Sequence, residues 1–409
     1  MEQPEKPRLR YFANSPGQRH IAAADHYLYR APEPRYRFNV IGTGTIGQEH
    51  MRVAALHGLA RIHGVFDTQA LSGDVAIEQY RALTGQAPRR HESLKSACND
   101  PEADALIVAT PNFTHLDVVR AAAAAGKPIL LEKPMATTLP DAVEIARLAR
   151  AAGAPVQVGL QYRYKAMYAE ARAEALARRA LGRLVTINLL EHRPPFLDKV
   201  GQWNKFQAHS GGTLIEKCCH YFDLMNLFAE GRPGRVYASG GQAVNFRDFE
   251  VDGRRADIAD HAHVIVDYDN GVRANLSLAM FCPEFTEEVV LCGDKGRLHG
   301  REVFDFQREP RSRTTLTVSH GENAATRNMQ LAYPDAIERS GHHGATYFEQ
   351  LAFVDRLDGK ETDAATLAEG FWSIAVGAAA EQSLQTARPV GIDELLADLG
   401  LDTADIDPN

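Results

Sequence analysis

The stretch FNVIGTGTIG, from Phe38 to Gly47, joins a short apolar strand to a glycine-rich turn that opens a helix. In this pattern Gly42 permits the tight turn, Gly44 lets the backbone approach a pyrophosphate, and Gly47 allows close packing of helix and strand. The phosphates would lie at the positive N-terminus of the helix. The predicted phosphate-binding residues are Gly42, Gly44, Thr45, Ile46 and Gly47.

The sequence on both sides of this turn supports a dinucleotide site rather than a glycine-rich turn in another fold. A second strand, RIHGVF, ends at the acid Asp67, about twenty residues beyond Gly47. Asp67 would accept hydrogen bonds from the ribose hydroxyls and repel a 2′-phosphate, and Thr68 offers no compensating cation. We therefore expect NAD as the cofactor rather than NADP.

Composition limits the other possibilities. The 409 residues suffice for two domains, and the net charge of -8 provides no basic surface for nucleic acid or an anionic membrane. We find no apolar run long enough to cross a membrane and no apolar signal core. The five cysteines form neither a CxxC pair nor an even disulfide set, which favours a reducing cytoplasm. The expected partner is a small molecule.

The chain divides into three predicted segments. Residues 1–35 form an added N-terminal arm, either poorly ordered or packed on a neighbouring surface through Tyr11, Tyr27 and Tyr29. Apolar strands alternate with helical stretches over residues 36–159, which predicts an α/β domain of the doubly wound Rossmann type with a parallel sheet. Ligands of such sheets bind beyond the carboxyl ends of the strands.

Residues 160–409 predict a C-terminal α+β domain that binds substrate and mediates oligomerisation. Helices are expected at 165–180 and 213–229, and hairpins at 260–281 and 287–300 indicate an open, mainly antiparallel sheet. Because an open sheet leaves one face uncovered, we expect a homo-oligomer, a dimer or tetramer, formed through that face.

Three segments converge on the predicted cleft: ATPNFTH at 109–115, LLEKPMA at 130–136 and GGTLIEKCCHYFD at 211–223. With the glycine turn, they resemble the Gfo/Idh/MocA family of nicotinamide-dependent sugar and polyol oxidoreductases over residues 36–390. The resemblance implies that Lys133 lies beside the reacting carbon and that Glu216 and His220 complete the acid/base group. It also implies cofactor contacts from Thr110, Pro111, Asn112, His115, Glu132 and Lys133.

The chemistry of alcohol oxidation supports these roles. Hydride transfer to a nicotinamide needs a base for the hydroxyl proton and a cation for the developing alkoxide, tasks that His220 and Lys133 can share. The cofactor's positive ring should favour neutral Lys133 or strengthen it as a hydrogen-bond donor. Glu216 and Asp223 fall on the helical face of His220. The family usually has Asp where this chain has Glu216, which either orients the imidazole or contacts substrate.

Substrate contacts are expected from residues 161–165, from residues 191–206 and from the histidine pair His342 and His343. Tyr162 and Arg163 follow the last parallel strand, where the resemblance places sugar-binding side chains. The proline-interrupted loop at 191–206 offers Trp203 to stack on a sugar ring and polar groups for its hydroxyls. Arg163, Arg193 and Lys199 would suit an anionic or heavily hydroxylated substrate. The expected substrate-binding residues are Lys133, Tyr162, Arg163, Arg193, Trp203, Asn204, Glu216, His220 and His343.

No metal site is expected in this chain. Cys218 and Cys219 adjoin His220, but consecutive helical residues point about 100° apart, so both thiols cannot share its face. Buried apolar packing accounts for them better. The histidines at 261 and 263 indicate a sheet surface or interface.

Three functions remain open. The leading hypothesis is an NAD-dependent dehydrogenase that oxidises a secondary hydroxyl of a cyclic polyol or sugar, such as an inositol, a pyranose or a glycoside, to a ketone. The alternative is a redox-neutral glycoside hydrolase that uses NAD for transient oxidation, elimination and re-reduction. A nucleotide-sensing protein without catalysis is the third, against which the Lys133, Glu216 and His220 set argues.

Overall fold

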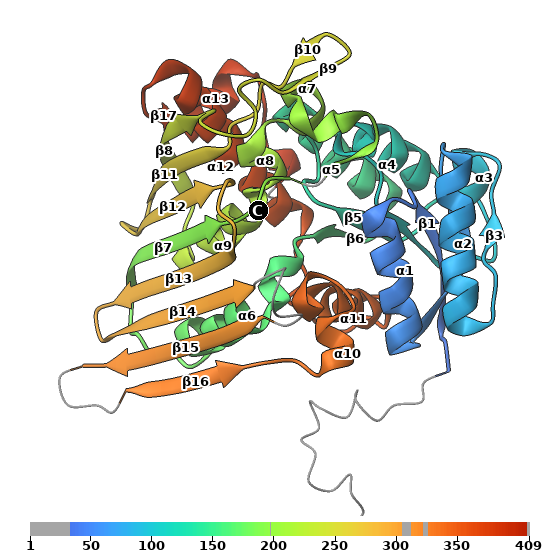
Figure 1. The fold of residues 1–409 in the computed structure, drawn as a ribbon, viewed down its shortest axis with the longest axis horizontal. Coiled ribbons are helices and arrows are strands. Elements are labelled where there is room, and N and C mark those ends of the chain that lie inside the picture. The colour runs from blue at the N-terminus through green and yellow to red at the C-terminus, as the bar shows by residue number, and fades with distance from the viewer. Residues whose placement is uncertain (1–32, 197, 305–311, 322–325, 407–409) are drawn as a thin grey trace, which may run out of the picture.

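The computed structural model describes residues 33–196, 198–304, 312–321 and 326–406. Most of the predicted arm, with Tyr11, Tyr27 and Tyr29, lies outside the described residues. Figure 1 shows a Rossmann domain on one side and a large sheet on the other, with helices between them. None of the helices in the described ranges has the length and apolar character needed to cross a bilayer.

The N-terminal domain is built on six parallel strands in the order β3-β2-β1-β4-β5-β6, which confirms the predicted doubly wound sheet. Strands β4, β5 and β6 are buried along their whole length, as expected for short apolar runs covered by helices on both faces. The elements are β1 (Tyr36–Ile41), α1 (Thr45–His57), β2 (Ala60–Phe66), α2 (Ala70–Thr84), β3 (Arg89–Arg90), α3 (Leu94–Cys98), β4 (Ala105–Val108), α4 (His115–Ala124), β5 (Ile129–Glu132), α5 (Leu139–Ala152) and β6 (Val156–Gly159).

The second sheet has nine strands in the order β16-β15-β14-β13-β7-β12-β11-β8-β17. Neighbours are antiparallel except β7 and β12, and both predicted hairpins are present as β11–β12 and β13–β14. Its strands are β7 (Leu184–His192), β8 (Pro233–Gly241), β11 (His261–Tyr268), β12 (Arg273–Ala279), β13 (Phe285–Gly293), β14 (Gly296–Phe304), β15 (Arg313–His320), β16 (Arg327–Leu331) and β17 (Val390–Gly391); β9 (Glu250–Val251) and β10 (Arg254–Arg255) pair separately.

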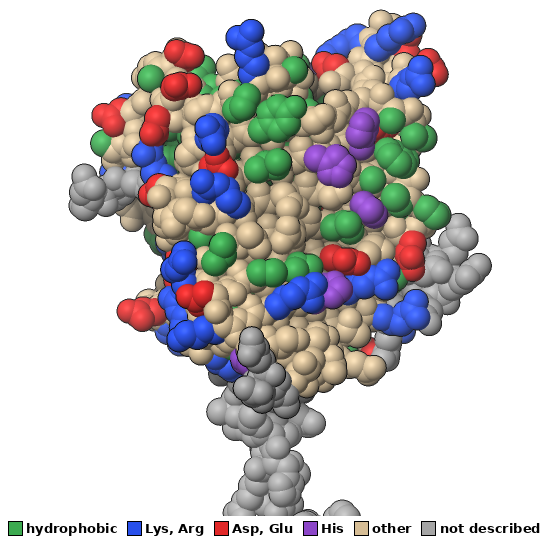
Figure 2. Space-filling model, turned by 90° about the vertical axis from the view of Figure 1, so that its left-hand side faces the viewer, with side chains coloured by type: hydrophobic (Ala, Val, Ile, Leu, Met, Phe, Trp, Pro, Cys, Tyr) green, Lys and Arg blue, Asp and Glu red, His purple; other side chains and the backbone are tan. Residues whose placement is uncertain are grey.

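Helices cover the face of this sheet that is turned toward the Rossmann domain, whereas the other face is open (Figures 1 and 2). Alternation along the strands explains the difference, since Val264 and Val266 of β11 are buried while Ile265 between them is 49% exposed. The helices are α6 (Ala166–Arg172), α7 (Gln207–Ser210), α8 (Thr213–Glu216), α9 (Cys219–Ala229), α10 (Asp335–Glu338), α11 (Ala345–Leu357), α12 (Leu367–Thr386) and α13 (Ile392–Asp398).

The helix predicted over 213–229 is wrong as a single element. It breaks after Glu216 into α8 and α9, and the turn is widened because the backbone N–H of Cys218 donates to the carbonyl of Thr213, five residues back, at 3.3 Å. Glu216 and His220 therefore do not share one continuous helical face.

Helix α11 belongs to the Rossmann core although it lies late in the sequence. Phe353 and Val354 are fully buried in the same cluster as Phe38 of β1, and the rings of Phe353 and Phe38 are 5.7 Å apart. Burying two large apolar side chains favours docking by several kcal/mol, on the order of 2 kcal/mol each. The C-terminal part of the chain thus helps to fix the nucleotide-binding domain.

Candidate active site

The glycine turn leaves one side open for a ligand. A Cβ at Gly47 would lie 2.0 Å from the carbonyl oxygen of Gly42, and Gly42 itself has φ +89°, so neither position tolerates a side chain. By contrast, a Cβ at Gly44 would meet no atom within 4 Å among the described residues. Thr45 begins α1 there, and its first turn has no side-chain cap within the described chain. The turn fits a dinucleotide pyrophosphate.

Asp67 lies where the ribose of such a cofactor is expected. One carboxylate oxygen accepts from the backbone N–H and the hydroxyl of Thr43, at 2.7 and 3.0 Å, and the other accepts from the N–H of Gln69 at 2.7 Å. These bonds tie the end of β2 to the glycine turn.

His115 joins the two turns that follow β4 and β5. Its ring nitrogens lie 2.9 Å from the carbonyl oxygen of Pro134 and 3.1 Å from that of Thr110. Within the same turn Thr114 donates to the Thr110 hydroxyl at 2.8 Å, and buried Asn112, which follows Pro111, has no partner for its amide nitrogen among the described residues. His115 therefore holds the two turns together. The amide nitrogen of Asn112 is a hydrogen-bond donor that a ligand could use.

A buried chain of hydrogen bonds fixes Glu132, the residue before Lys133. The imidazole of His50 lies 2.8 Å from one Glu132 oxygen, and the other accepts from the backbone N–H of Lys133 at 3.1 Å. The amide of Gln350, from α11, donates to His50 at 2.8 Å and lies 3.0 Å from His57 through its oxygen. These hydrogen bonds connect α1 and α11 to the turn that carries Lys133.

The donor and acceptor of each hydrogen bond in this series can be assigned from the groups at its two ends. The backbone N–H of Leu59 donates to Nδ1 of His57, so Nε2 of His57 carries the proton and donates to the Gln350 oxygen. Gln350 then donates to Nδ1 of His50, which leaves Nε2 of His50 to donate to Glu132. Burial tends to raise the pKa of Glu132, but the His50 hydrogen bond and nearby Lys133 outweigh it and hold that pKa below its usual value.

Lys133, which follows β5, meets Glu216 at the end of α8. The ammonium Nζ of Lys133 donates to the Glu216 carbonyl at 3.1 Å and lies 3.7 Å from its carboxylate oxygen Oε1, while Oε2 has no hydrogen-bond partner within the described ranges. Burial lowers the pKa of Lys133, but the charge of Glu216 outweighs it, so the pKa is raised. Lys133 is therefore cationic in the free protein.

His220 is buried and stacked on Tyr162, with ring centroids 3.9 Å apart and planes 8° from parallel. Its Nδ1 has no hydrogen-bond partner in the described part of the chain. Burial, followed by the charge of Lys133, lowers the pKa of His220 well below 6.5, so the imidazole is neutral at pH 7. Glu216 faces Lys133 rather than pairing with His220.

Sequence reasoning missed a charged wall on the inner face of the sheet. Nζ of Lys217 lies 2.9 Å from Glu191 of β7, and Nζ of Lys165 lies 2.8 Å from Glu287 of β13 and 2.6 Å from Glu302 of β14. All five side chains are buried. Buried charged side chains are expected only where each is paired with an opposite charge.

A signal for the wall was present in the strands. Glu191 has the same alternation as the buried Ile187 and Leu189, and Glu287 that of buried Val289, so acids fall on the apolar face of the sheet. Lys217 also donates to the hydroxyl of Tyr162 at 2.7 Å, which links the wall to the His220 stack.

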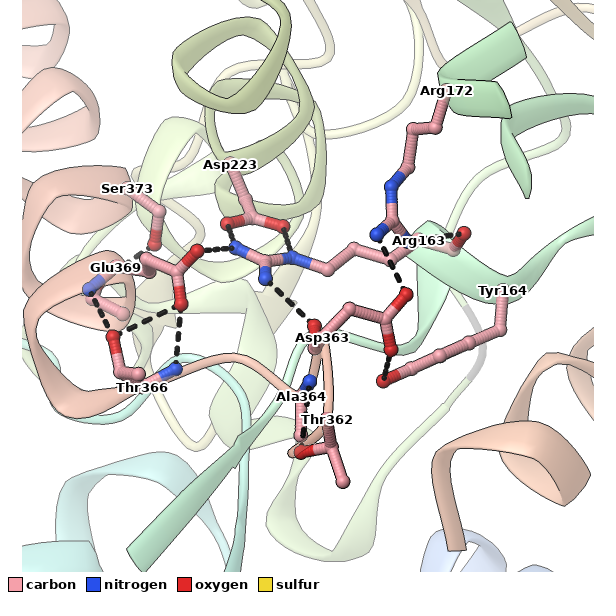
Figure 3. Close-up of polar contacts among 11 residues, drawn as sticks. Arg163, Tyr164, Arg172, Asp223, Thr362, Asp363, Ala364, Thr366, Glu369 and Ser373 are labelled. Atoms are coloured by element: carbon pink, nitrogen blue, oxygen red, sulfur yellow. Dashed lines mark hydrogen bonds and ion pairs between the residues drawn. The ribbon is translucent and has the colours of Figure 1, made fainter. Parts of the chain in front are cut away.

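The guanidinium of Arg163 is occupied by groups of the protein itself. Figure 3 shows its guanidinium between the carboxylates of Asp223 and Glu369: Nε donates to Asp223 at 2.7 Å, and Nη2 lies 2.9 Å from Glu369. A third nitrogen donates to the carbonyl of Asp363 at 3.2 Å. Because these contacts occupy all its nitrogens, Arg163 and Asp223 form a buried structural pair, and we no longer propose Arg163 as a substrate contact.

The remaining expected substrate residues lie in two regions, one beside the charged wall and one over the Rossmann domain. Arg193 lies against the ring of Phe285 and 3.5 Å from Glu191, beside the charged wall. Trp203 packs against Phe113 of the cofactor-side turn, with centroids 6.2 Å apart, so its loop lies over the Rossmann domain. Two others are Asn204, which is buried beside Trp203, and His343, whose Nε2 is 4.0 Å from Glu302.

Fold and strand-end residues together are those of a two-domain, dinucleotide-binding oxidoreductase. The chain belongs to the Gfo/Idh/MocA oxidoreductase family: residues 36–160 match the family's NAD-binding Rossmann fold, and residues 173–392 match its C-terminal alpha/beta domain. The resemblance drawn from the sequence is thereby confirmed.

Relatives extend this result. The rhizopine catabolism protein MocA of Rhizobium meliloti is 30% identical over 213 residues, which span 52% of this chain and 60% of MocA. Myo-inositol 2-dehydrogenase of Thermotoga maritima is 24% identical over 88% of this chain and 99% of its own. The structure of levoglucosan dehydrogenase in complex with NADH and levoglucosan shares the fold, with a TM-score of 0.72, 18% identity and coverage of 87% of this chain and 99% of that one.

Replacing Arg163 by Met should destabilise the protein by about 3–5 kcal/mol, because it leaves the Asp223 carboxylate buried without its partner. Urea unfolding measures the loss. Arg81→Met, which breaks an exposed pair with Glu78, is the control and should cost less than about 1 kcal/mol. If the variant lost no more stability than the control and its KM rose, Arg163 would instead be a substrate contact.

Proposed function

We propose that this protein is an NAD-dependent dehydrogenase that oxidises a secondary hydroxyl of a cyclic polyol or sugar to a ketone. The observation that carries the proposal is the Lys133 ammonium, fixed at the end of β5 and 3.7 Å from the Glu216 carboxylate. The names of its relatives support the substrate class, since they include inositol and levoglucosan dehydrogenases.

Bound NAD would supply the hydride acceptor, and the chain's own residues would handle the proton. Lys133, being cationic, donates a hydrogen bond to the substrate oxygen and stabilises its developing negative charge. His220, being neutral, can accept the hydroxyl proton on its imidazole. Glu216 limits the positive charge around them. The reported relatives include no hydrolase, and we do not pursue the redox-neutral glycosidase.

The open face of the second sheet supports a homo-oligomer, a dimer or tetramer. Figure 2 shows apolar and histidine side chains on this face, and Tyr237 and Ile265, opposite each other on β8 and β11, are 39% and 49% exposed. We propose that a second copy covers them.

Lys133→Met should reduce turnover at least about 1000-fold, because it removes the donor to the reacting oxygen, while leaving NAD affinity within a few-fold. The assay follows NADH formation on a panel of inositols, free sugars and glycosides. Lys95→Met, at an exposed position of α3, is the matched control. Wild-type protein that binds NAD but oxidises no member of the panel, or a Lys133→Met variant that retains turnover, contradicts the proposal.

Asp67→Asn should raise the ratio of NADP to NAD efficiency by about tenfold, because it removes the charge that would repel a 2′-phosphate. The ratio is measured as kcat/KM for each cofactor with one substrate. Asp74→Asn, at an exposed acid of α2, should leave it unchanged. Equal use of both cofactors by the wild type would contradict the proposed role of Asp67.

Ile265→Glu should convert the oligomer to smaller species, because it places a charge in the covered face. Light scattering measures the mass, and Leu71→Glu, at a 75% exposed position on α2, is the control. A wild-type mass equal to one chain, or an equal effect of both variants, would refute the interface.

A further inference from the structure

A second cluster of titratable side chains lies on the Rossmann domain, away from Lys133. His63 comes from the middle of β2, whereas Asp100 and Glu102 come from the loop between α3 and β4. His91, just after β3, lies beside them. Figure 1 shows β3 and α3 at the edge of the molecule opposite the second sheet, so this cluster is separate from the candidate active site.

The spacing of the three side chains fits a metal ion. Nε2 of His63 lies 3.2 Å from Oδ2 of Asp100 and 3.6 Å from Oε2 of Glu102, and the three ligand atoms are all within 4.8 Å of one another. Zinc ligands at about 2.0–2.1 Å in a tetrahedral arrangement lie about 3.3 Å apart. The two distances from His63 to the carboxylates therefore match edges of a zinc coordination tetrahedron.

The same contacts are poor hydrogen bonds. Nε2 of His63 is buried and has no hydrogen-bond partner in the described ranges, although two carboxylate oxygens flank it. In a tetrahedral site an ion lies along the axis of the ring nitrogen, and the other ligands lie to either side of that axis. The carboxylate oxygens of Asp100 and Glu102 likewise lie near Nε2 of His63 without forming hydrogen bonds with it.

The charge of Asp100 also calls for a cation. The Asp100 side chain is 1% exposed. In the described part of the chain its ion-pair partners are both histidines, His63 and His91. A divalent ion would balance the carboxylate.

The neighbourhood of His91 points the same way. Its Nε2 lies 3.2 Å from both the amide nitrogen of Asn39 and Oδ2 of Asp100. A proton on Nε2 faces the Asn39 donor, and a proton on Nδ1 leaves the Nε2 lone pair facing the carboxylate. No neutral tautomer satisfies both contacts. A cation bound to Asp100 would draw negative charge from the carboxylate and so weaken its repulsion with the Nε2 lone pair of His91.

The other candidate group lacks these properties. His50, Glu132 and Glu349 are also close together and buried. However, Nε2 of His50 carries the proton that it donates to Glu132, at 2.8 Å, so it has no lone pair for a metal.

We propose that His63, Asp100 and Glu102 bind one zinc-type divalent ion, with water completing the coordination and His91 packed behind Asp100. One imidazole and two carboxylates suit zinc better than magnesium or calcium, which prefer oxygen ligands alone. The ion would tie β2 to the α3–β4 loop and take no part in hydride transfer.

Titrating chelator-stripped, tag-free full-length protein with Zn²⁺ by calorimetry tests the site. We expect one ion per chain at micromolar Zn²⁺ and a saturable rise in Tm. His63→Ala and Glu102→Gln should each weaken binding at least tenfold. Glu92→Gln, at an exposed acid nearby, should bind as the wild type.

The Glu102 side chain is 62% exposed, so Glu102→Gln should fold even if His63→Ala does not. Dehydrogenase turnover of folded variants should match the wild type, which separates this site from the proposed catalytic one. No stoichiometric binding by the wild type at 100-fold excess Zn²⁺ would overturn the proposal. So would equal binding by wild type and Glu102→Gln.

Discussion

The position of Lys133 depends on one buried carboxylate, that of Glu132. It accepts from His50 on one side and from the backbone of Lys133 on the other, and the chain continues through Gln350 to His57. Since Gln350 comes from α11, a helix late in the sequence that packs in the Rossmann core, the C-terminal part of the chain helps to fix the turn that carries Lys133. Displacing α11 would break this set of directed hydrogen bonds.

The charged wall imposes a second constraint. Three carboxylates and two lysines are removed from water on the inner face of the sheet, which costs several kcal/mol per ion unless each is paired. An apolar face would pack as well and cost less. Lys217 also donates to the hydroxyl of Tyr162, on which His220 is stacked, so the paired charges help to hold the His220 ring in place.

The Rossmann domain could be predicted because its determinants are local: a Cβ at Gly47 would lie 2.0 Å from the Gly42 oxygen, so the motif itself fixes the turn. The type of the second sheet was likewise readable from hairpins, but not its central parallel pair, which brings Thr186 beside Arg273. Arg163 pairs with Asp223, 60 positions away, and no local pattern reveals which way it turns. The helix break after Glu216 coincides with the contact between Lys217 and Glu191, also a tertiary feature.

The two possible proton acceptors of the proposed reaction, Lys133 and His220, depend differently on the charge of Glu216. Lys133 must lose its proton before it can act as a base, and Glu216 opposes that loss by raising its pKa. His220 needs no such loss, but burial and the Lys133 charge disfavour the imidazolium. The two assignments predict opposite effects of removing the Glu216 charge: it would ease deprotonation of Lys133 and make protonated His220 still less favourable. Glu216 is thus the residue at which the two mechanisms can be distinguished.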